Sequence, residues 1–247
     1  MQGWTSYREG FFLYETAKKC SGRGVIVEIG SWKGRSTVCL GLGSLAGNKV
    51  KIYAIDPHTG SPDHIASHPG EKIWTFKEFK ENMKNAGVDN VVEPLLKASD
   101  EAAQIWKEPI EFLYLDVNYH DYELSKNDLA DWSKHVIDGG TIAIHNTYPD
   151  LRAIIFENQP LFGWPGPRRV LKEFVFGSKN FKNIGIVSNI TYATKCNQNT
   201  FLDRLRGRLT QLKGFFSLFA LKIYLILVQL PQPVKKFVKR LLFRAKN

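Results

Sequence analysis

The stretch Val27–Thr37, VEIGSWKGRST, decides the fold of this chain. The apolar run 25–29 is typical of a buried strand, and this strand breaks at Gly30. The chain then turns through Gly34 into a segment that we expect to be a helix ending near 41–43. A strand, a glycine turn and a helix in this order predict the opening unit of an α/β domain.

A second apolar run, 50–55, ends on Asp56, 28 residues after Glu28. Because ligands of a parallel α/β sheet bind beyond the carboxyl ends of its strands, an acid there can accept both hydroxyls of a ribose. The turn has only Gly30 and Gly34, whereas a dinucleotide fold needs G-x-G-x-x-G to bring backbone amides to a pyrophosphate. The spacing therefore predicts a bound nucleoside and disfavours a nicotinamide-dependent dehydrogenase.

Strands and helices alternate along most of the chain. Further strands are predicted at 91–96, 112–116, 141–145, 183–187 and 190–195, and helices at 6–20, 74–86 and 124–135. This alternation predicts an α/β fold, a doubly wound, mainly parallel and Rossmann-like sheet of seven strands.

The composition is that of one globular domain in a reducing compartment. The 247 residues are 43% hydrophobic and 13% aromatic, which is enough for one full core. Cys20, Cys39 and Cys196 are far apart and odd in number, so we expect free thiols. The N-terminus lacks the basic and apolar regions of a secretory signal, which favours the cytoplasm.

The net charge of +10 lies entirely at the C-terminal end. Residues 1–200 hold 23 basic and 23 acidic side chains, whereas residues 201–247 hold 11 basic side chains and one acid. We therefore expect a neutral domain over 1–200 and a basic helical appendage over 201–247. A uniformly basic surface would have indicated nucleic acid; this distribution indicates a membrane surface.

Polar side chains follow two more strands of the predicted sheet. They are Asp116, Asn118, His120, His145 and Asn146. Because the carboxyl ends of parallel strands meet at one edge, we expect all five to lie near Glu28 and Asp56. Core packing alone does not require so many polar groups at one edge.

The motifs together resemble those of a known family. They are E-x-G-S-W-x-G-x-S-T from Glu28, I-D-P-H-x-G from Ile55, D-x-x-x-H-x-Y from Asp116, G-G-x-I-A-x-H from Gly139 and G-P-R-R-V from Gly166. Over roughly residues 3–196 they are similar to the catechol-O-methyltransferase-like branch of the class I S-adenosylmethionine-dependent methyltransferases, a bacterial group often found among sugar and natural-product O-methyltransferases.

The resemblance implies a site for S-adenosylmethionine. The residues that it places against this cofactor are Glu28, Gly30, Ser31, Gly34, Asp56, Ser99, Asp100 and Asp116. The residues of the first turn would line the methionine end, Asp56 would take the ribose, and Ser99 and Asp100 would flank the adenine. Asp116 matches an acid near the methyl-transfer centre, where relatives often bind a divalent metal.

The chain departs from this family at its metal-facing positions. The usual block reads D-G-D-H and the later strand usually ends in H-D, but this chain has Asn118 and Asn146 where those acids stand. Because Mg²⁺ prefers charged oxygen ligands, a metal on Asp116 and Asn146 should bind weakly, and metal-free transfer remains open. His145 and His120 match histidines near the acceptor and are the candidate general bases.

The C-terminal segment has the pattern of a membrane anchor. From Phe215 to Leu230, 13 of 16 residues are apolar, but Lys222 disfavours a helix that crosses the bilayer. After Pro231, residues 234–242 place apolar and basic side chains on opposite faces. We expect peripheral membrane contact through residues 209–244; packing on the domain or a homo-oligomer interface is the alternative.

These patterns favour an O-methyltransferase that acts on a sugar hydroxyl, or on a related small or lipid-linked acceptor, at the cytoplasmic face of the membrane. No nucleic-acid partner is expected. The alternative is a non-catalytic module that binds the cofactor but has lost the reaction together with its metal-binding carboxylates.

Overall fold

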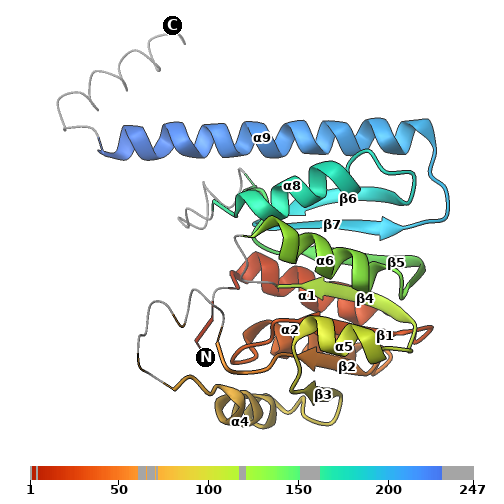
Figure 1. The fold of residues 1–247 in the computed structure, drawn as a ribbon, viewed down its shortest axis with the longest axis vertical. Coiled ribbons are helices and arrows are strands. Elements are labelled where there is room, and N and C mark those ends of the chain that lie inside the picture. Colours follow the sequence, from red (N-terminus) through yellow and green to blue (C-terminus); the bar gives the residue numbers. More distant parts are fainter. Residues whose placement is uncertain are drawn as a thin grey trace, which may run out of the picture.

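The computed structural model describes residues 2–3, 5–60, 65, 70, 72–116, 121–150 and 162–229. In chain order its elements are α1 (Tyr7–Lys19), β1 (Val25–Ile29), α2 (Arg35–Ala46), β2 (Ile52–Ile55), α4 (Phe76–Ala86), β3 (Val92–Leu95), α5 (Ser99–Ile105), β4 (Ile110–Leu115), α6 (Tyr122–Ser133), β5 (Val136–Ile144), α8 (Pro165–Phe174), β6 (Phe181–Val187), β7 (Ile190–Lys195) and α9 (Phe201–Gln229). Figure 1 shows their arrangement.

The strands form one seven-stranded sheet in the order β3-β2-β1-β4-β5-β7-β6. The first five strands of this order pair in parallel, and β7 pairs antiparallel with both β5 and β6. The sheet confirms the doubly wound, mainly parallel fold predicted from the sequence. The strand order reverses between β1 and β4, and ligands of such sheets bind in the crevice at this reversal.

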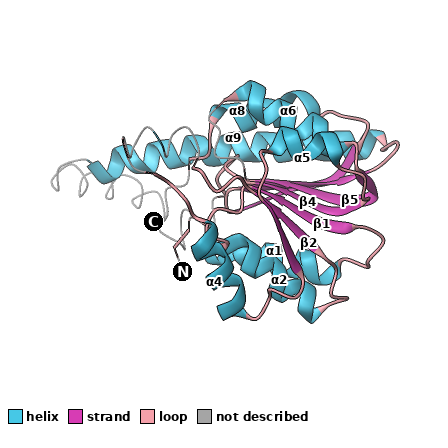
Figure 2. Cartoon of the chain, turned by 60° about the horizontal axis from the view of Figure 1, so that its bottom comes forward, coloured by secondary structure: helices cyan, strands magenta, loops and turns pink. Residues whose placement is uncertain are grey.

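Helices cover both faces of the sheet. α1, α2 and α4 lie on one face, and α5, α6 and α8 lie on the other (Figure 2). Each face has its own buried apolar core: Ile26 of β1 belongs to the core beneath α1 and α2, whereas Val27 belongs to the core beneath α5 and α6. This alternation along β1 is the two-residue period of a strand covered on both sides.

The helix after the first turn is longer than predicted. α2 continues through Gly41 and Gly43 to Ala46, because these glycines are packing positions. A Cβ on Gly41 would lie 2.6 Å from Cβ of Val88, and one on Gly43 would lie 2.2 Å from the carbonyl oxygen of Tyr14. The two glycines therefore let α1 and the segment after α4 approach α2 closely, and they do not end the helix.

The C-terminal helix also begins earlier than the apolar run that predicted it. Thr200 starts α9, since its hydroxyl accepts a hydrogen bond from the Asp203 amide at 3.2 Å and Oδ2 of Asp203 accepts one from the Thr200 amide at 3.0 Å. α9 packs along β6, the outermost strand on one side of the sheet. Residues 230–247, which include the predicted amphipathic segment 234–242, lie outside the described residues.

α9 reaches past the domain at one end. Its C-terminal part extends beyond the sheet on the side where the parallel strands end (Figures 1 and 2). Over Phe201–Ile226 the helix is long and apolar enough to cross a membrane by length and composition, with a mean hydropathy of 1.3 over its most apolar window. Only 22% of that window is buried against the domain.

Candidate active site

Glu28, at the end of β1, is a fully buried carboxyl group. Its Oε2 accepts a hydrogen bond from the hydroxyl of Thr37 in the first turns of α2. Its Oε1 has no hydrogen-bond partner among the described residues. Burial raises the pKa of Glu28 to about 8, against the opposing effect of the Ser36 and Thr37 hydroxyls, and the charges of Asp116 and Asp56 raise it further. Glu28 is therefore mostly protonated at neutral pH, with one oxygen unused.

The turn after β1 is held tightly against β4. Gly30 has φ of 87°, its amide donates to the Ile55 carbonyl at 2.9 Å, and a Cβ on it would lie 2.3 Å from the carbonyl oxygen of Asp116. Only glycine fits such a position. Ser31 follows, and its Oγ is buried without a hydrogen-bond partner among the described residues. Gly34, in the left-handed conformation, is the N-cap of α2.

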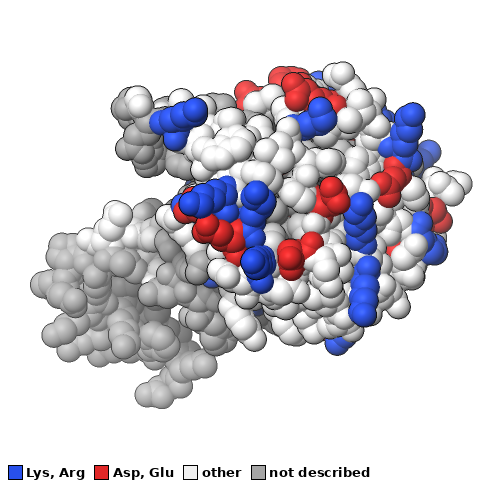
Figure 3. Space-filling view, turned by 90° about the horizontal axis from the view of Figure 1, so that it is seen from below, with Lys and Arg blue, Asp and Glu red and all other residues white. Residues whose placement is uncertain are grey.

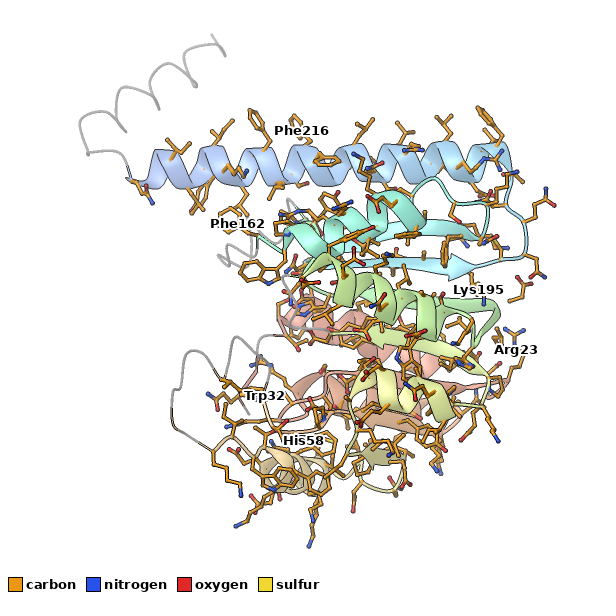
Figure 4. All side chains as sticks on the ribbon, in the orientation of Figure 1. Arg23, Trp32, His58, Phe162, Lys195 and Phe216 are labelled. Atoms are coloured by element: carbon orange, nitrogen blue, oxygen red, sulfur yellow. The ribbon has the colours of Figure 1, made fainter. Side chains whose placement is uncertain are left out.

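Asp56 holds the two loops that meet at the crevice. Its Oδ2 accepts a hydrogen bond from the amide of Trp32 at 2.7 Å, and its Oδ1 accepts one from the amide of His58 at 2.6 Å. Figure 4 shows Trp32 and His58 at the same end of the sheet. The carboxylate predicted to take a ribose therefore also fixes the backbone around it, and each oxygen keeps a further lone pair for a ligand.

His58 is a buried neighbour of this carboxylate that sequence reasoning did not single out. Its Nδ1 lies 2.9 Å from the hydroxyl of Thr75, just before α4. Burial lowers the pKa of His58, although the charge of Asp56 opposes this. His58 is therefore neutral and helps to join the loop after β2 to α4.

His145, at the end of β5, lies between two carboxylates. Its Nδ1 is 2.6 Å from Oδ1 of Asp116, and its Nε2 is 3.4 Å from Oε1 of Glu9 in α1. Burial by itself would lower the pKa of His145, but the charges and hydrogen bonds of Asp116 and Glu9 raise it well above its ordinary value. The imidazole therefore holds its proton at neutral pH, which opposes the base role predicted for it.

Glu9 is the part of this site that sequence reasoning missed. It is fully buried, and burial alone would raise its pKa, but the charge of His145 and several hydrogen bonds lower it. Its Oε2 accepts from the Ser6 amide at 2.7 Å, and its Oε1 accepts from the Asn189 amide at 3.0 Å. The sequence signal was Ser6-x-x-Glu9, which predicts a helix N-terminus but not a partner 136 positions further along the chain.

Asp116 and Asn146, the predicted metal ligands, each have a hydrogen-bond partner in the protein. Oδ1 of Asp116 is paired with His145, and Oδ1 of Asn146 accepts a hydrogen bond from Nδ2 of Asn189 at 3.1 Å. Within the described ranges, no three His, Cys, Asp or Glu side chains come together as possible metal ligands. Asn146 has φ of 56°, a left-handed conformation that asparagine tolerates better than most residues.

Ser99 and Asp100 lie where α5 begins. The hydroxyl of Ser99 donates to Oδ1 of Asp128 and accepts from Nε1 of Trp132 at 2.8 Å, so it is engaged in joining α5 to α6. Burial raises the pKa of Asp128 to about 6. Asp100 is exposed at the first turn of the helix. Of the two residues predicted to flank adenine, only Asp100 therefore has its side chain turned to solvent.

Two of the predicted residues lie outside the described part of the chain. Asn118 and His120 belong to 117–120, which the structure does not describe. Glu28, Asp56, Asp116 and His145 do end adjacent strands at one edge, as predicted.

Known proteins resemble this chain in sequence and in fold. Residues 27–147 match a family model described as a methyltransferase domain. Among solved structures, the O-methyltransferase NovP is 14% identical over 77% of this chain and 80% of its own, with a TM-score of 0.60. The O-methyltransferase TomG from Streptomyces achromogenes, in complex with S-adenosylmethionine, is 16% identical over 78% of this chain and 82% of its own, with a TM-score of 0.52.

An O-methyltransferase from Bacillus cereus, in complex with S-adenosylhomocysteine, is 17% identical over 77% of this chain and 82% of its own, with a TM-score of 0.50. At these identities the solved structures show a shared fold, and the family model adds the type of domain. Together with the glycine turn and the acids at the edge of the sheet, they identify residues 27–147 as a methyltransferase domain on a Rossmann-like fold.

Proposed function

We propose that the enzyme transfers the methyl group of S-adenosylmethionine to a hydroxyl of a sugar, or of a related small or lipid-linked acceptor, at the cytoplasmic face of the membrane. The observation that carries this proposal is the methyltransferase domain over 27–147, which contains Glu28, Asp56, Asp116 and His145. Several of the similar solved structures are of O-methyltransferases, which supports an oxygen acceptor.

The described residues fit the cofactor. Oε1 of Glu28 and Oγ of Ser31 are buried and have no partner within the described ranges, so they suit a polar ligand group beside the turn. Asp56 has lone pairs left for the two ribose hydroxyls. When bound, the cofactor supplies an electrophilic methyl group on its sulfonium. The chain's own task is to hold an acceptor hydroxyl in line and to take its proton.

Asp116 is the described group best placed to face the acceptor. Its side chain is 19% exposed, whereas that of His145 is 4% exposed. Protonated His145 donates from Nδ1 to Asp116 and thereby holds the carboxylate in one orientation. We therefore assign His145 to positioning and leave the base role with His120, the other predicted candidate, four residues after Asp116 in the chain.

A divalent metal would be held only weakly by the described donors. Asp116 is the single carboxylate of the predicted pair with Asn146, and Mg²⁺ prefers charged oxygen ligands. Changing Asn146→Asp while adding Mg²⁺ tests this point. No gain in turnover is expected, since Oδ1 at position 146 already accepts from Asn189. A metal-dependent gain would show that the lost carboxylate matters.

The decisive experiment combines binding with turnover. Calorimetry with S-adenosylhomocysteine measures the cofactor site, and mass spectrometry of a panel of sugars and glycolipids incubated with S-adenosylmethionine detects methylated products. We expect binding and transfer to at least one hydroxyl acceptor. Asp116→Asn should lose at least about tenfold in turnover. Asp131→Asn, at a half-exposed position of α6 that is 3.7 Å from Lys134, should keep it. Binding without any turnover would favour the non-catalytic module, and no binding would overturn both.

A further inference from the structure

Most of the side chains that α9 turns inward are small or polar, and most of its large apolar side chains face outward. The buried stripe facing β6 and Tyr148 contains Gly207, Gln211, Gly214, Ser217 and Leu221. A Cβ on Gly214 would lie 2.8 Å from the ring of Tyr148, so this close contact requires glycine. A helix that only packs on a soluble domain has the opposite distribution, with its apolar stripe toward the core.

The outward face is a continuous apolar ridge. Its members follow one another at three or four residues and are 42% to 70% exposed: Phe201, Leu205, Leu209, Leu212, Phe216, Phe219 and Ile223. At 1.5 Å per residue the ridge is roughly 33 Å long. Phe216 points away from the sheet in Figure 4. An exposed apolar surface of this length marks an interaction site.

Basic side chains border the ridge on both sides. By helical geometry, Arg208 and Lys222 lie along one flank, and Arg206 and Lys213 lie along the other. All four are exposed, and Asp203 is the single acid of α9. In contrast, the face of the molecule at the α4 end mixes acidic and basic side chains (Figure 3).

We infer that the ridge of α9 lies in the surface of an anionic lipid bilayer, with its axis in the membrane plane. An apolar ridge between two basic rows fits acyl chains below and headgroup phosphates at the sides. A second copy fits less well, because two such ridges would bring basic rows together without acids. Crossing the bilayer fits less well too, since the stripe that holds Gln211 and Ser217 is packed on the domain.

This contact would place the reaction site near the membrane, a step that rests on the proposed function. Phe215 of α9 contacts Tyr148, which follows the end of β5, with ring centroids 5.3 Å apart. The 14 residues of α9 after Phe215 therefore extend past the edge that holds Asp116 and His145. A lipid-linked acceptor embedded beside α9 would reach this edge without leaving the bilayer.

Vesicle cosedimentation of the full chain tests the ridge. We expect binding to vesicles of phosphatidylcholine with phosphatidylglycerol, and a loss of about tenfold or more for Phe219→Glu. The matched control is Ile105→Glu at the end of α5, because Ile105 and Phe219 are each 61% exposed. Lys213→Gln and Lys222→Gln should each weaken binding to anionic vesicles about fivefold.

Three outcomes would overturn the inference. The first is equal binding by the wild type and Phe219→Glu, which would assign binding to residues 230–247. The second is a dimer in sedimentation that Phe219→Glu converts to monomer while vesicles bind neither. The third is retention on membranes through an alkaline carbonate wash, which would indicate a spanning helix. Calorimetry with S-adenosylhomocysteine on the same samples reports the proposed function separately, because ridge variants should leave it unchanged.

Discussion

The edge formed by the carboxyl ends of the parallel strands and the helix α9 both reverse the usual placement of side chains: titratable groups are buried at the edge, and large apolar groups are exposed on α9. At the edge, the titratable side chains of Glu9, Glu28 and His145 are almost completely buried, whereas along α9 Phe216 is 65% exposed and Gln211 is buried. Burial of the titratable groups costs folding free energy, which their neighbouring side chains partly offset. The apolar side chains of the ridge are exposed in the unfolded chain as well, so they cost the fold little, but a surface of this kind marks an interaction site. Within the described chain nothing covers the ridge.

The largest effect expected at the edge is that of Gly30→Ala. Gly22 has the same φ of 87°, but no atom lies within 4 Å of the place that a Cβ would take, so Gly22→Ala is the matched control. Both changes cost about 1 to 2 kcal/mol for the left-handed backbone. Gly30→Ala also drives a Cβ against the Asp116 carbonyl, and we expect a total of roughly 4 to 5 kcal/mol.

Urea unfolding measures both glycine variants, and calorimetry with S-adenosylhomocysteine should show that only Gly30→Ala loses binding. Equal unfolding free energies for the two variants would mean that β1 and β4 are not held together at this turn. The backbone at the edge would then tolerate an added side chain, as an exposed position of α9 does.

The second prediction concerns Glu28→Gln and pH. Glu28 titrates at about 8 when folded, against an ordinary value of 4.5, so the wild type loses stability as pH rises between these values. Glutamine lacks this proton. Relative to the wild type, the variant should therefore gain roughly 4 kcal/mol of unfolding free energy between about pH 5 and pH 8.

Denaturant titrations at several pH values measure this slope. Glu111→Gln is the control, because Glu111 is also buried but accepts hydrogen bonds from Ser21 and the Gly22 amide at the other end of the sheet. At pH 8, Glu111→Gln should lower the unfolding free energy relative to the wild type, whereas Glu28→Gln should raise it. Parallel curves for the wild type and Glu28→Gln would show that Glu28 is ionised in the folded protein.

The third prediction tests the pairing of His145 with Glu9. Glu9→Gln removes one of two charges that raise the pKa of His145, so this pKa should fall in an NMR titration. The interactions that raise the pKa of His145 stabilise the folded protein fully below about pH 6.5, and this stabilisation is lost as pH rises through the pKa of folded His145. The interactions that lower the pKa of Glu9 stabilise the folded protein above about pH 4.5. The penalty of Glu9→Gln, about 2 to 3 kcal/mol, should therefore be largest between about pH 4.5 and pH 6.5.

Glu15→Gln is the control for Glu9→Gln on the same helix. Glu15 pairs with Lys19 at 3.8 Å on the surface, and its loss should cost at most about 0.5 kcal/mol. An unchanged titration of His145 in Glu9→Gln would mean that Glu9 does not act on the imidazole and that Asp116 alone raises the pKa of His145.

The fold was readable from the sequence because its signals are local. The run 25–29 and the break at Gly30 predicted β1 and its turn, and the alternation of elements predicted a parallel sheet. Gly41 and Gly43 misled because a glycine that allows close packing and one that ends a helix look alike in a sequence. Only the contacts with Val88 and Tyr14 distinguish them.

The site was readable only in part. The ends of strands brought Glu28, Asp56 and Asp116 together, since a parallel sheet fixes where strands end. The proton of His145 was predictable only in part, because its raised pKa depends first on Asp116, which the strand ends place nearby, and then on Glu9, whose position follows from how α1 packs. The ridge of α9 was not predicted either. Hydropathy showed that the segment is apolar, but it did not show which face packs on β6, because that depends on the close contacts of Gly207 and Gly214.

The smallest effect on the unfolding free energy is expected for the exposed apolar side chains of α9. Phe216→Ser removes a large apolar side chain that is 65% exposed, and it should change the unfolding free energy by no more than about 0.5 kcal/mol. Leu221→Ser, five residues later on the buried stripe, should cost about 2 to 4 kcal/mol. Urea unfolding without lipid measures both. A large cost for Phe216→Ser in solution would mean that the chain itself covers the ridge, and the contrast between the edge and α9 would then disappear.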